Sequence, residues 1–149
     1  MPCLVRKGQG RKMPSTKIEL NHNQISRVQG LDEFARLLFP NNRNHQMVFL
    51  AVFIELKYAS DQFLPSLVFL CEKYGVGRRV LETVRSKMRR MGLIDHVSRF
   101  NKRYGYREGW VFSTRFRKAC TRLSDLPMAF RQRIDPKQER KDRDLFRYL

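Results

Sequence analysis

The sequence predicts a mainly α-helical α+β fold, because three neighbouring patterns agree. Residues 65–74 carry apolar side chains at helical spacing and lead into a turn that holds two glycines. Residues 78–91 form a second amphipathic stretch, dense in arginine. Residues 93–100 and 110–113 then have the character of paired strands around a tip with two more glycines. The expected architecture is two helices joined by a tight turn, then a strand hairpin, with extra helices on both sides in the sequence.

Each element of this central segment has a local reason to form. Pro65 is expected at the first helical position, where its missing N–H is tolerated. Gly75 is expected to end that helix, and Gly92 is a natural C-cap for the next one. The first helix is predicted to bury Leu67, Val68, Leu70 and Cys71.

Two further helices are predicted before this segment. Residues 31–39 place apolar side chains on one side and acidic ones in the first turn, where they suit the helix dipole. A helix over 45–59, with Asn44 as its N-cap, is apolar nearly all round and is therefore expected at the centre of the fold. Short strands are expected at 18–20 and within 61–64.

Two helices are expected after the hairpin. The first covers 114–123 with Ser113 as cap, and Pro127 is expected to interrupt the chain beyond it. The second runs from Pro136 to Leu149 behind an Asp135 cap. The helix over 114–123 is predicted to bury Phe116, Ala119, Cys120 and Leu123. The predicted organisation is a flexible basic arm over 1–17, a domain over 18–134 and a C-terminal helix over 135–149.

The chain is strongly basic. Its 149 residues carry a formal net charge of +17, while a hydrophobic content of 42% is enough for a core. The electrostatic field of such a charge favours a polyanionic partner, most often nucleic acid and more rarely an anionic membrane surface. Residues 18–77 carry a net charge of −1 and residues 78–94 a net charge of +5, so the excess begins at Arg78. This asymmetry indicates a binding face.

Cysteine usage and hydropathy favour a soluble cytoplasmic protein. The three cysteines are odd in number and far apart, which fits neither a disulfide framework nor a metal site. The longest apolar run, from Met47 to Ile54, is too short to span a bilayer. The first residues show no signal-peptide core.

Nothing in the sequence has the spacing of a catalytic site. His22, His45 and His96 are scattered, with no carboxylate or cysteine at ligand or catalytic distance in the sequence. No glycine-rich phosphate loop of the Walker type is present. We therefore expect a protein that is not an enzyme and that needs no cofactor or metal.

The predicted helix over 78–91 divides into two faces when its residues are placed at 100° intervals. The inward set is Leu81, Val84, Met88 and Met91, and the outward set is Arg79, Thr83, Ser86 and Arg90, flanked by Glu82, Arg85 and Arg89. Six basic residues, Lys87 among them, stand against Glu82 alone, whereas an ordinary solvated helix face mixes signs. We expect this outward face to meet a polyanion.

The order of elements over residues 44–113 resembles the winged helix-turn-helix superfamily. The resemblance is carried by the string Leu70-Cys71-Glu72-Lys73-Tyr74-Gly75-Val76, then Val80-Leu81, Val84, Met88 and Met91-Gly92-Leu93-Ile94. It is similar to the pattern in which a Gly-Val turn leads to a recognition helix that ends in Gly-Leu-Ile before the wing. Gly77 departs from the small polar cap that many members have. The resemblance implies a DNA-binding module.

The resemblance also implies roles for individual residues. The N-terminal half of the second helix would face base edges, where arginine pairs with guanine and glutamate accepts from cytosine. The candidates for base contacts are Arg78, Arg79, Glu82, Thr83 and Ser86, and those for phosphates are Arg85, Arg89 and Arg90 on the helix with Lys102, Arg103 and Arg107 on the wing.

Three classes of function are consistent with these patterns. The leading one is sequence-specific binding of double-stranded DNA, most simply by a dimeric transcriptional regulator associated with the nucleoid; a replication or mobile-element protein would look the same. An RNA-binding or ribonucleoprotein component is the alternative, with Tyr104 or Tyr106 stacking on single-stranded bases. A winged helix used for protein interaction is the third, with an apolar patch at 145–149 as its candidate surface.

Overall fold

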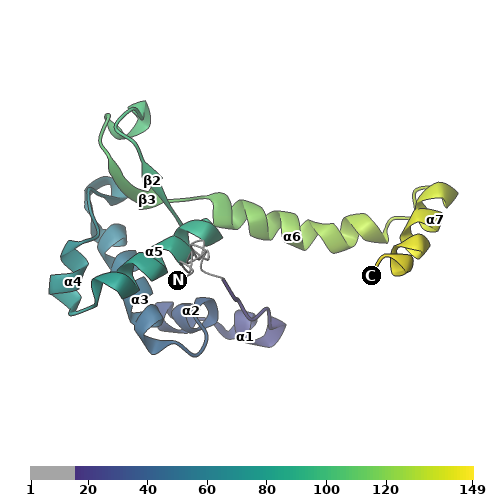
Figure 1. Ribbon diagram of the computed structural model, residues 1–149, viewed down its shortest axis with the longest axis horizontal. Coiled ribbons are helices and arrows are strands. Elements are labelled where there is room, and N and C mark those ends of the chain that lie inside the picture. Colours follow the sequence, from purple (N-terminus) through teal and green to yellow (C-terminus); the bar gives the residue numbers. More distant parts are fainter. Residues whose placement is uncertain (1–15) are drawn as a thin grey trace, which may run out of the picture. The chain divides into compact units, whose positions relative to one another are not determined.

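The structure is a computed structural model that describes residues 16–149 (Figure 1). It is mainly helical with a small three-stranded antiparallel sheet, which confirms the predicted α+β class. The chain divides into two units, one that ends at Ser113 and one over Thr114–Leu149. The basic arm predicted over 1–17 lies almost wholly outside the described residues.

The two units differ in composition. Over residues 16–113, the first unit holds helices α1 (His22–Arg27), α2 (Leu31–Leu38), α3 (Arg43–Tyr58), α4 (Phe69–Tyr74) and α5 (Arg78–Met91), strands β1 (Phe63–Leu64), β2 (Ile94–Val97) and β3 (Gly109–Phe112), and 3-10 turns η1 (Ser60–Gln62) and η2 (Lys102–Tyr104). The second unit holds α6 (Arg115–Arg131), α7 (Pro136–Asp144) and the 3-10 turn η3 (Leu145–Arg147).

Helix α3 lies at the centre of the core of the first unit, as its apolar character predicts. The buried residues of α3 are Val48, Phe49, Ala51, Val52 and Leu56. The ring of Phe49 is fully buried, 5.8 Å from the ring of Phe34 and 5.7 Å from those of Phe39 and Phe53. Two apolar side chains of α3, Met47 and Ile54, remain exposed on its outer side.

Helix α5 packs against α3 and has the predicted bounds at both ends. Leu81, Val84 and Met88 are buried, so the predicted inward face is confirmed, with Met91 half-buried at its end. Gly92 ends the helix with φ 83°, in the left-handed region that glycine adopts without strain. Gly75 ends α4 in the same conformation, so the two glycine stops are also confirmed.

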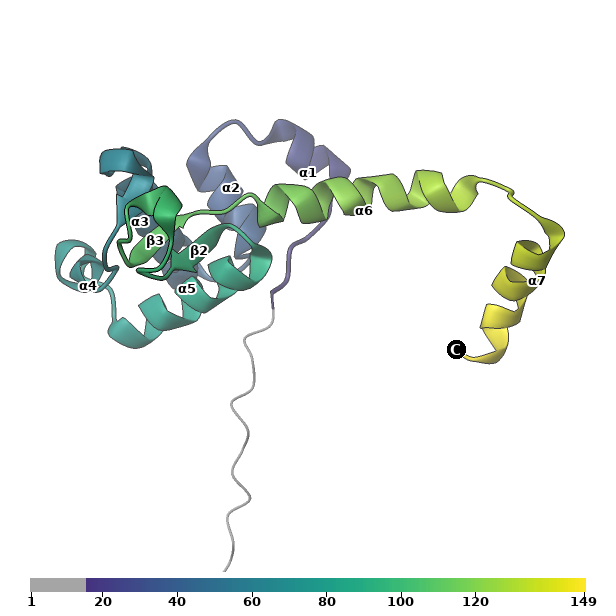
Figure 2. The ribbon, with the colours of Figure 1, turned by 90° about the horizontal axis from the view of Figure 1, so that it is seen from above.

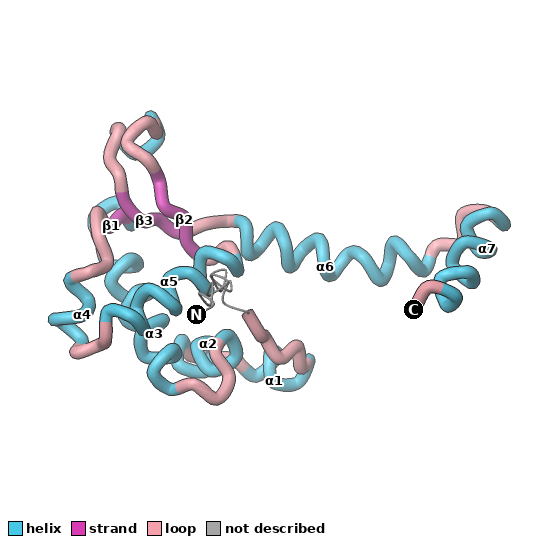
Figure 3. The backbone as a smooth tube through the Cα atoms, viewed as in Figure 1, coloured by secondary structure: helices cyan, strands magenta, loops and turns pink. Residues whose placement is uncertain are grey.

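The sheet has the strand order β1-β3-β2, with both pairs antiparallel (Figure 3). The hairpin β2–β3 forms as predicted but is shorter than 93–100 and 110–113, with Ile94 opposite Phe112 and Val97 opposite Gly109. A side chain at Gly109 would collide with the Leu64 carbonyl oxygen at 2.5 Å and the Phe63 ring at 2.6 Å. Glycine is thus what lets β1 approach β3.

Two predictions about the first part of the chain are wrong. Residues 18–20 form no strand; Leu20 is exposed, and the short helix α1 follows directly, capped by Asn21. Helix α3 begins at Arg43, because Asn42 rather than Asn44 caps it through a 3.1 Å hydrogen bond from the His45 N–H to Asn42 Oδ1.

The predicted role of Pro65 is also wrong. It lies in the connection after β1, and α4 starts only at Phe69. Ser66 Oγ accepts a 3.2 Å hydrogen bond from the Val68 N–H, which forms a local turn before the helix. Leu67 and Leu70 are buried as predicted, whereas Val68 is 48% exposed and Cys71 is half-buried.

The second unit departs most from expectation. Helix α6 continues through Pro127 to Arg131 instead of stopping near residue 123, and it buries none of its residues. The predicted cap and first residue of the last helix are confirmed, since Asp135 Oδ1 accepts a 2.8 Å hydrogen bond from the Gln138 N–H. That helix ends at Asp144, and η3 follows in place of a helix to Leu149.

Candidate nucleic-acid interface

The predicted outward face of α5 is on the surface of the first unit. Arg78, Arg79, Glu82, Ser86, Arg89 and Arg90 are exposed, and Thr83 and Arg85 are half-buried. These side chains lie opposite a fully buried stripe, so the helix cannot rotate to hide them without exposing its core residues. The structure therefore brings the eight helix candidates together on one element.

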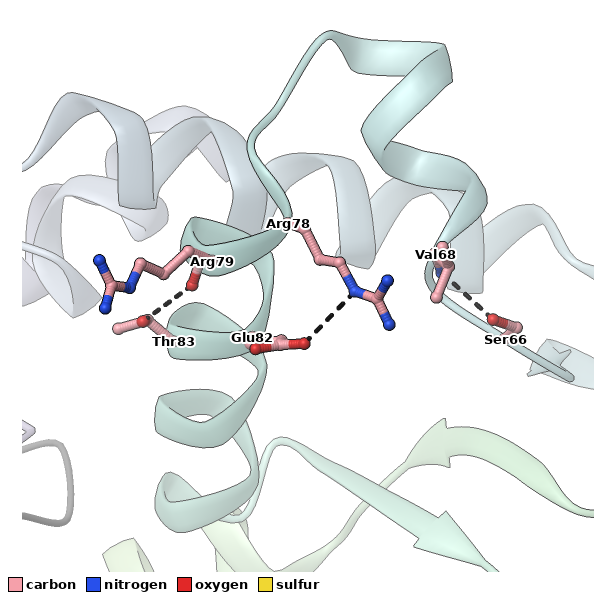
Figure 4. Close-up of polar contacts among 6 residues, drawn as sticks. All are labelled: Ser66, Val68, Arg78, Arg79, Glu82 and Thr83. Carbon is pink, nitrogen blue, oxygen red and sulfur yellow. Dashed lines mark hydrogen bonds and ion pairs between the residues drawn. The ribbon is translucent and has the colours of Figure 1, made fainter. Parts of the chain in front are cut away.

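At the start of α5, two of the candidate residues form an ion pair. Arg78 Nε lies 3.5 Å from Glu82 Oε1, one turn along the helix (Figure 4). Both side chains are more than half exposed, and such a pair stabilises a helix by only about 0.3–0.5 kcal/mol. The pair can therefore open at small cost when a stronger partner approaches.

Arg79 leaves α5 on the other side from Arg78 (Figure 4). Thr83 Oγ1 donates a 3.0 Å hydrogen bond to the Arg79 carbonyl oxygen, which leaves the Thr83 hydroxyl only as an acceptor. Neither Arg79 nor Arg90 makes an ion pair with another residue in the part of the chain that the structure describes. Both guanidinium groups are open to solvent and to a ligand.

Arg85 contacts an aromatic side chain of the hairpin, which the sequence did not suggest. Its guanidinium carbon lies 5.2 Å from the centre of the Trp110 ring on β3, and Trp110 is only 8% exposed. On the same strand pair, the His96 ring lies 4.8 Å from Trp110 and His96 Nε2 lies 3.6 Å from Glu108 Oε1. Arg85 thus joins α5 to the hairpin, which fixes the two elements relative to each other.

Lys87 differs from the other basic residues of α5. The outward face was expected to include it, but its Nζ lies 3.2 Å from His45 Nδ1 on α3, and both residues are half-buried. A lysine ammonium has only donors, so the ring nitrogen accepts. Partial burial, and after it the positive charge of Lys87, lower the pKa of His45 below its ordinary value of 6.5. The basic surface is therefore one charge smaller than the sequence predicts.

This contact predicts a pH dependence of stability. The folded pKa of His45 is lowered, so just below pH 6.5 the unfolded chain binds more protons than the folded chain. The free energy of unfolding should then fall as the pH drops through that window, and should not change through this group above it. Urea unfolding of the wild type and of His45→Gln between pH 8 and 5 checks this. A smaller slope in His45→Gln is expected; identical slopes would contradict it.

The candidate wing residues do not behave alike. Lys102 and Arg103 are both exposed. The guanidinium carbon of Arg103 lies 5.6 Å from the centre of the ring of the adjacent Tyr104. Arg107 instead binds its own chain: Nε donates to the Tyr104 carbonyl oxygen at 3.0 Å, and Nη2 lies 3.5 Å from Asp61 Oδ2. Its guanidinium also lies 4.4 Å from the centre of the Phe63 ring. Through these contacts, Arg107 holds the hairpin tip against β1 and the turn before it.

Two exposed residues of this hairpin were not among the candidates predicted from the sequence. Arg99 is exposed between β2 and the tip, and the adjacent Phe100 is 85% exposed. Of the two tyrosines considered as stacking groups, Tyr106 is 61% exposed, while Tyr104 is half-buried with its ring 6.1 Å from Phe63. The adjacent basic and aromatic pair Arg99-Phe100 was the signal in the sequence that could have identified them.

A polar cluster holds α4 on α3. Lys73 Nζ lies 2.5 Å from Glu55 Oε1, and the Tyr74 hydroxyl donates to the same oxygen at 2.6 Å. The hydrogen bond from Lys73, followed by that from Tyr74, lowers the pKa of Glu55, and the same contacts raise the pKa of both partners. The cluster fixes α4 on the core immediately before the Gly75 turn, and so it positions the start of α5.

Over the described residues, no group of three or more His, Cys, Asp or Glu side chains is arranged to hold a metal ion. None of the helices in residues 16–149 has the length and apolar character to cross a membrane. No protein-family model, no curated protein and no solved structure matches this chain. The interface is therefore interpreted from its own residues.

Proposed function

We propose that the first unit is a winged helix-turn-helix module that binds double-stranded DNA, with α5 in the major groove and the β2–β3 tip as the wing. One observation carries the proposal: the outward face of α5 is largely exposed and carries five arginines against the single carboxylate of Glu82, and the buried stripe on its other side holds it there. An α-helix fits the major groove, and arginines supply the phosphate and guanine contacts that DNA requires.

Different parts of α5 contact different parts of the DNA. The base edges are contacted from the N-terminal part of the helix by Arg78, Arg79, Glu82, Thr83 and Ser86. The Arg78–Glu82 ion pair opens when these contacts form. Arg89 and Arg90, in the last turn, take phosphates. Gly77 gives the helix no side-chain cap, so the N–H groups of the first turn add a partial positive charge toward an anion.

The wing takes a smaller share of contacts. Lys102 and Arg103 reach phosphates, while Arg85 and Arg107 orient the hairpin through Trp110 and Asp61. The side chain of Arg85 is half-buried, and its exposed part adds a phosphate contact at the base of the hairpin. Arg107 keeps its proposed phosphate contact only if the Asp61 pair opens.

On this proposal the protein acts as a transcriptional regulator, and it binds DNA as a homodimer. The spare helices of the second unit provide a surface for pairing that the DNA-binding face does not use. Two copies on one DNA would read two half-sites, so the preferred site should be palindromic.

RNA is the second candidate, and exposed aromatic side chains favour it. Phe100 and Tyr106 are 85% and 61% exposed on the same hairpin as Lys102 and Arg103. Aromatic rings beside basic residues are what single-stranded bases stack on. This hypothesis moves the binding site from α5 to the hairpin tip.

The test is binding of the full chain to a labelled random-sequence duplex over a range of salt concentrations. Trp110, the single tryptophan, contacts α5 and provides a fluorescence signal. Contact with about five phosphates predicts a slope near −4.5 in a plot of log affinity against log salt. A nearly flat plot would reject nucleic-acid binding altogether. Preference for single-stranded RNA at equal salt, lost in Phe100→Ala, would support the second candidate instead.

A further inference from the structure

Helix α6 carries an apolar stripe that nothing in its own unit covers. Phe116, Ala119, Leu123, Leu126 and Phe130 recur at alternating spacings of three and four residues. This is the a/d spacing of a coiled-coil seam. None of them is fully buried: Phe116 and Leu126 are half-buried, Ala119 is exposed, and Leu123 and Phe130 are 55% and 80% exposed. The helix runs without a break along the whole stripe (Figure 2).

The opposite side of α6 is mostly polar. It carries Arg117, Lys118, Thr121, Ser124 and Asp125, all exposed, and one apolar side chain, Met128, which is 65% exposed. The helix is thus amphipathic over most of its 17 residues, and the described elements of its own unit provide no buried core along its apolar side. Helical stability in proteins comes mainly from packing an apolar face. The pattern therefore indicates a partner for the stripe.

We propose that this stripe packs against the same stripe of a second copy of the chain, so that α6 pairs with α6 in a parallel two-helix seam. The inference deepens the proposed homodimer and rests on it, but not on DNA binding. Phe130, which is 80% exposed, offers most of the ~150–250 Å² that an aromatic side chain can bury, and the half-buried Phe116 offers less. With the aliphatic side chains between them, the seam is a continuous apolar surface smaller than the ~800 Å² per partner of a standard-size interface.

The charges beside the seam select the parallel orientation. Arg115 and Arg122 lie along one edge, and the uncharged Cys120 and Pro127 lie along the other. In a parallel pair each edge faces the opposite edge of the partner, so arginine meets an uncharged residue. In an antiparallel pair each edge faces its own copy, which brings arginine toward arginine. A parallel pair also joins both first units to the same end of the seam.

The competing occupant is the terminal segment of the same chain. Leu145, Phe146, Tyr148 and Leu149 are all exposed, from 60% to 99%. Five residues at a 3-10 rise of about 2 Å cover only ~10 Å, whereas α6 at 1.5 Å per residue is ~25 Å long. The terminal segment is therefore too short to cover the stripe, and a second α6 matches its length.

The experiment is sedimentation of the full chain without DNA, comparing Leu123→Glu with Thr121→Glu on the polar side. The wild type and Thr121→Glu should form a dimer at micromolar concentrations, and Leu123→Glu should weaken association at least 100-fold while keeping its circular dichroism. A wild type that stays monomeric, or a Leu123→Glu variant that pairs like Thr121→Glu, overturns the proposal. Because no DNA is present, a failure of DNA binding leaves this result unaffected.

A cross-linking measurement tests orientation and does not depend on the folding of Leu123→Glu. In a background with Cys3→Ser, Cys71→Ala and Cys120→Ser, the Ala119→Cys side chain faces its own copy only across a parallel seam. Oxidation should give a covalent dimer, and Asp125→Cys on the polar side should give none. No dimer from Ala119→Cys, or equal yields from both, overturns the parallel pairing.

Discussion

Reversing two charges, Arg79→Glu together with Arg90→Glu, is expected to reduce affinity for duplex DNA by at least ~100-fold, because each good arginine contact is worth about 1–3 kcal/mol. Both guanidinium groups are exposed on the outward side of α5 and make no ion pair with another described residue. Their removal therefore breaks no contact that supports the fold, and the loss should appear in binding alone. Anisotropy of a labelled duplex at constant salt measures it.

The matched control is Arg27→Glu with Lys57→Glu, on α1 and α3. It makes the same change in net charge at exposed positions outside α5. A general electrostatic attraction would weaken binding equally in both double variants, whereas the proposed interface predicts a much larger loss in the α5 variant. Milder truncation, Arg79→Ala with Arg90→Ala, should reduce the salt slope by about 1, since Arg90 is the phosphate contact of the pair and each phosphate contact contributes about 1. Undiminished binding by the α5 charge reversal would reject α5 as the interface.

The position and orientation of α5 could be predicted because local signals agree there. Gly75 and Gly92 adopt left-handed conformations that few other residues tolerate, so they end α4 and α5 at definite positions. The apolar positions Leu81, Val84 and Met88 share one side of a helix, and that side is the buried one. The separation of an inward from an outward face thus follows from the sequence alone.

Contacts between distant segments could not be predicted. The sequence shows that Lys87 and Arg107 are basic, but not that His45 or Asp61 lies beside them in the fold. Trp110 is 25 positions beyond Arg85, and only the packing of the hairpin on α5 joins them. Such pairings depend on tertiary packing, which periodicity does not encode, and they change which arginines remain available to a ligand.

Some helix bounds, at starts and at ends, were also hard to predict. Asn42 and Asn44 are both good caps, and nothing in the local sequence selects Asn42. Pro65 is compatible with a first helical turn but equally with the extended connection it adopts after β1. Pro127 was expected to break α6 because it lacks an N–H, yet the helix continues through it. At Asn42 and Pro65 the local sequence is compatible with two structures, and tertiary packing decides between them.

The largest effect on stability is expected at the centre of the first unit. Phe49→Ala should lower the free energy of unfolding by about 3–5 kcal/mol, because a fully buried ring is replaced by a cavity. Three aromatic rings, those of Phe34, Phe39 and Phe53, lie within 6 Å of it and cannot all move to fill the space. Urea unfolding followed by Trp110 fluorescence measures the loss.

Phe100→Ala is the matched control, because it makes the same chemical change at a side chain that is 85% exposed. It should alter stability by no more than ~0.5 kcal/mol. Whole-domain stabilities are typically about 5–15 kcal/mol, so Phe49→Ala should remove a large share of the stability of the first unit and unfold it at a lower urea concentration. DNA binding should then fall with the folded fraction and recover on cooling or at lower urea, unlike the loss caused by charge reversal on α5. Equal stability losses in the two alanine variants would mean that α3 does not carry the core.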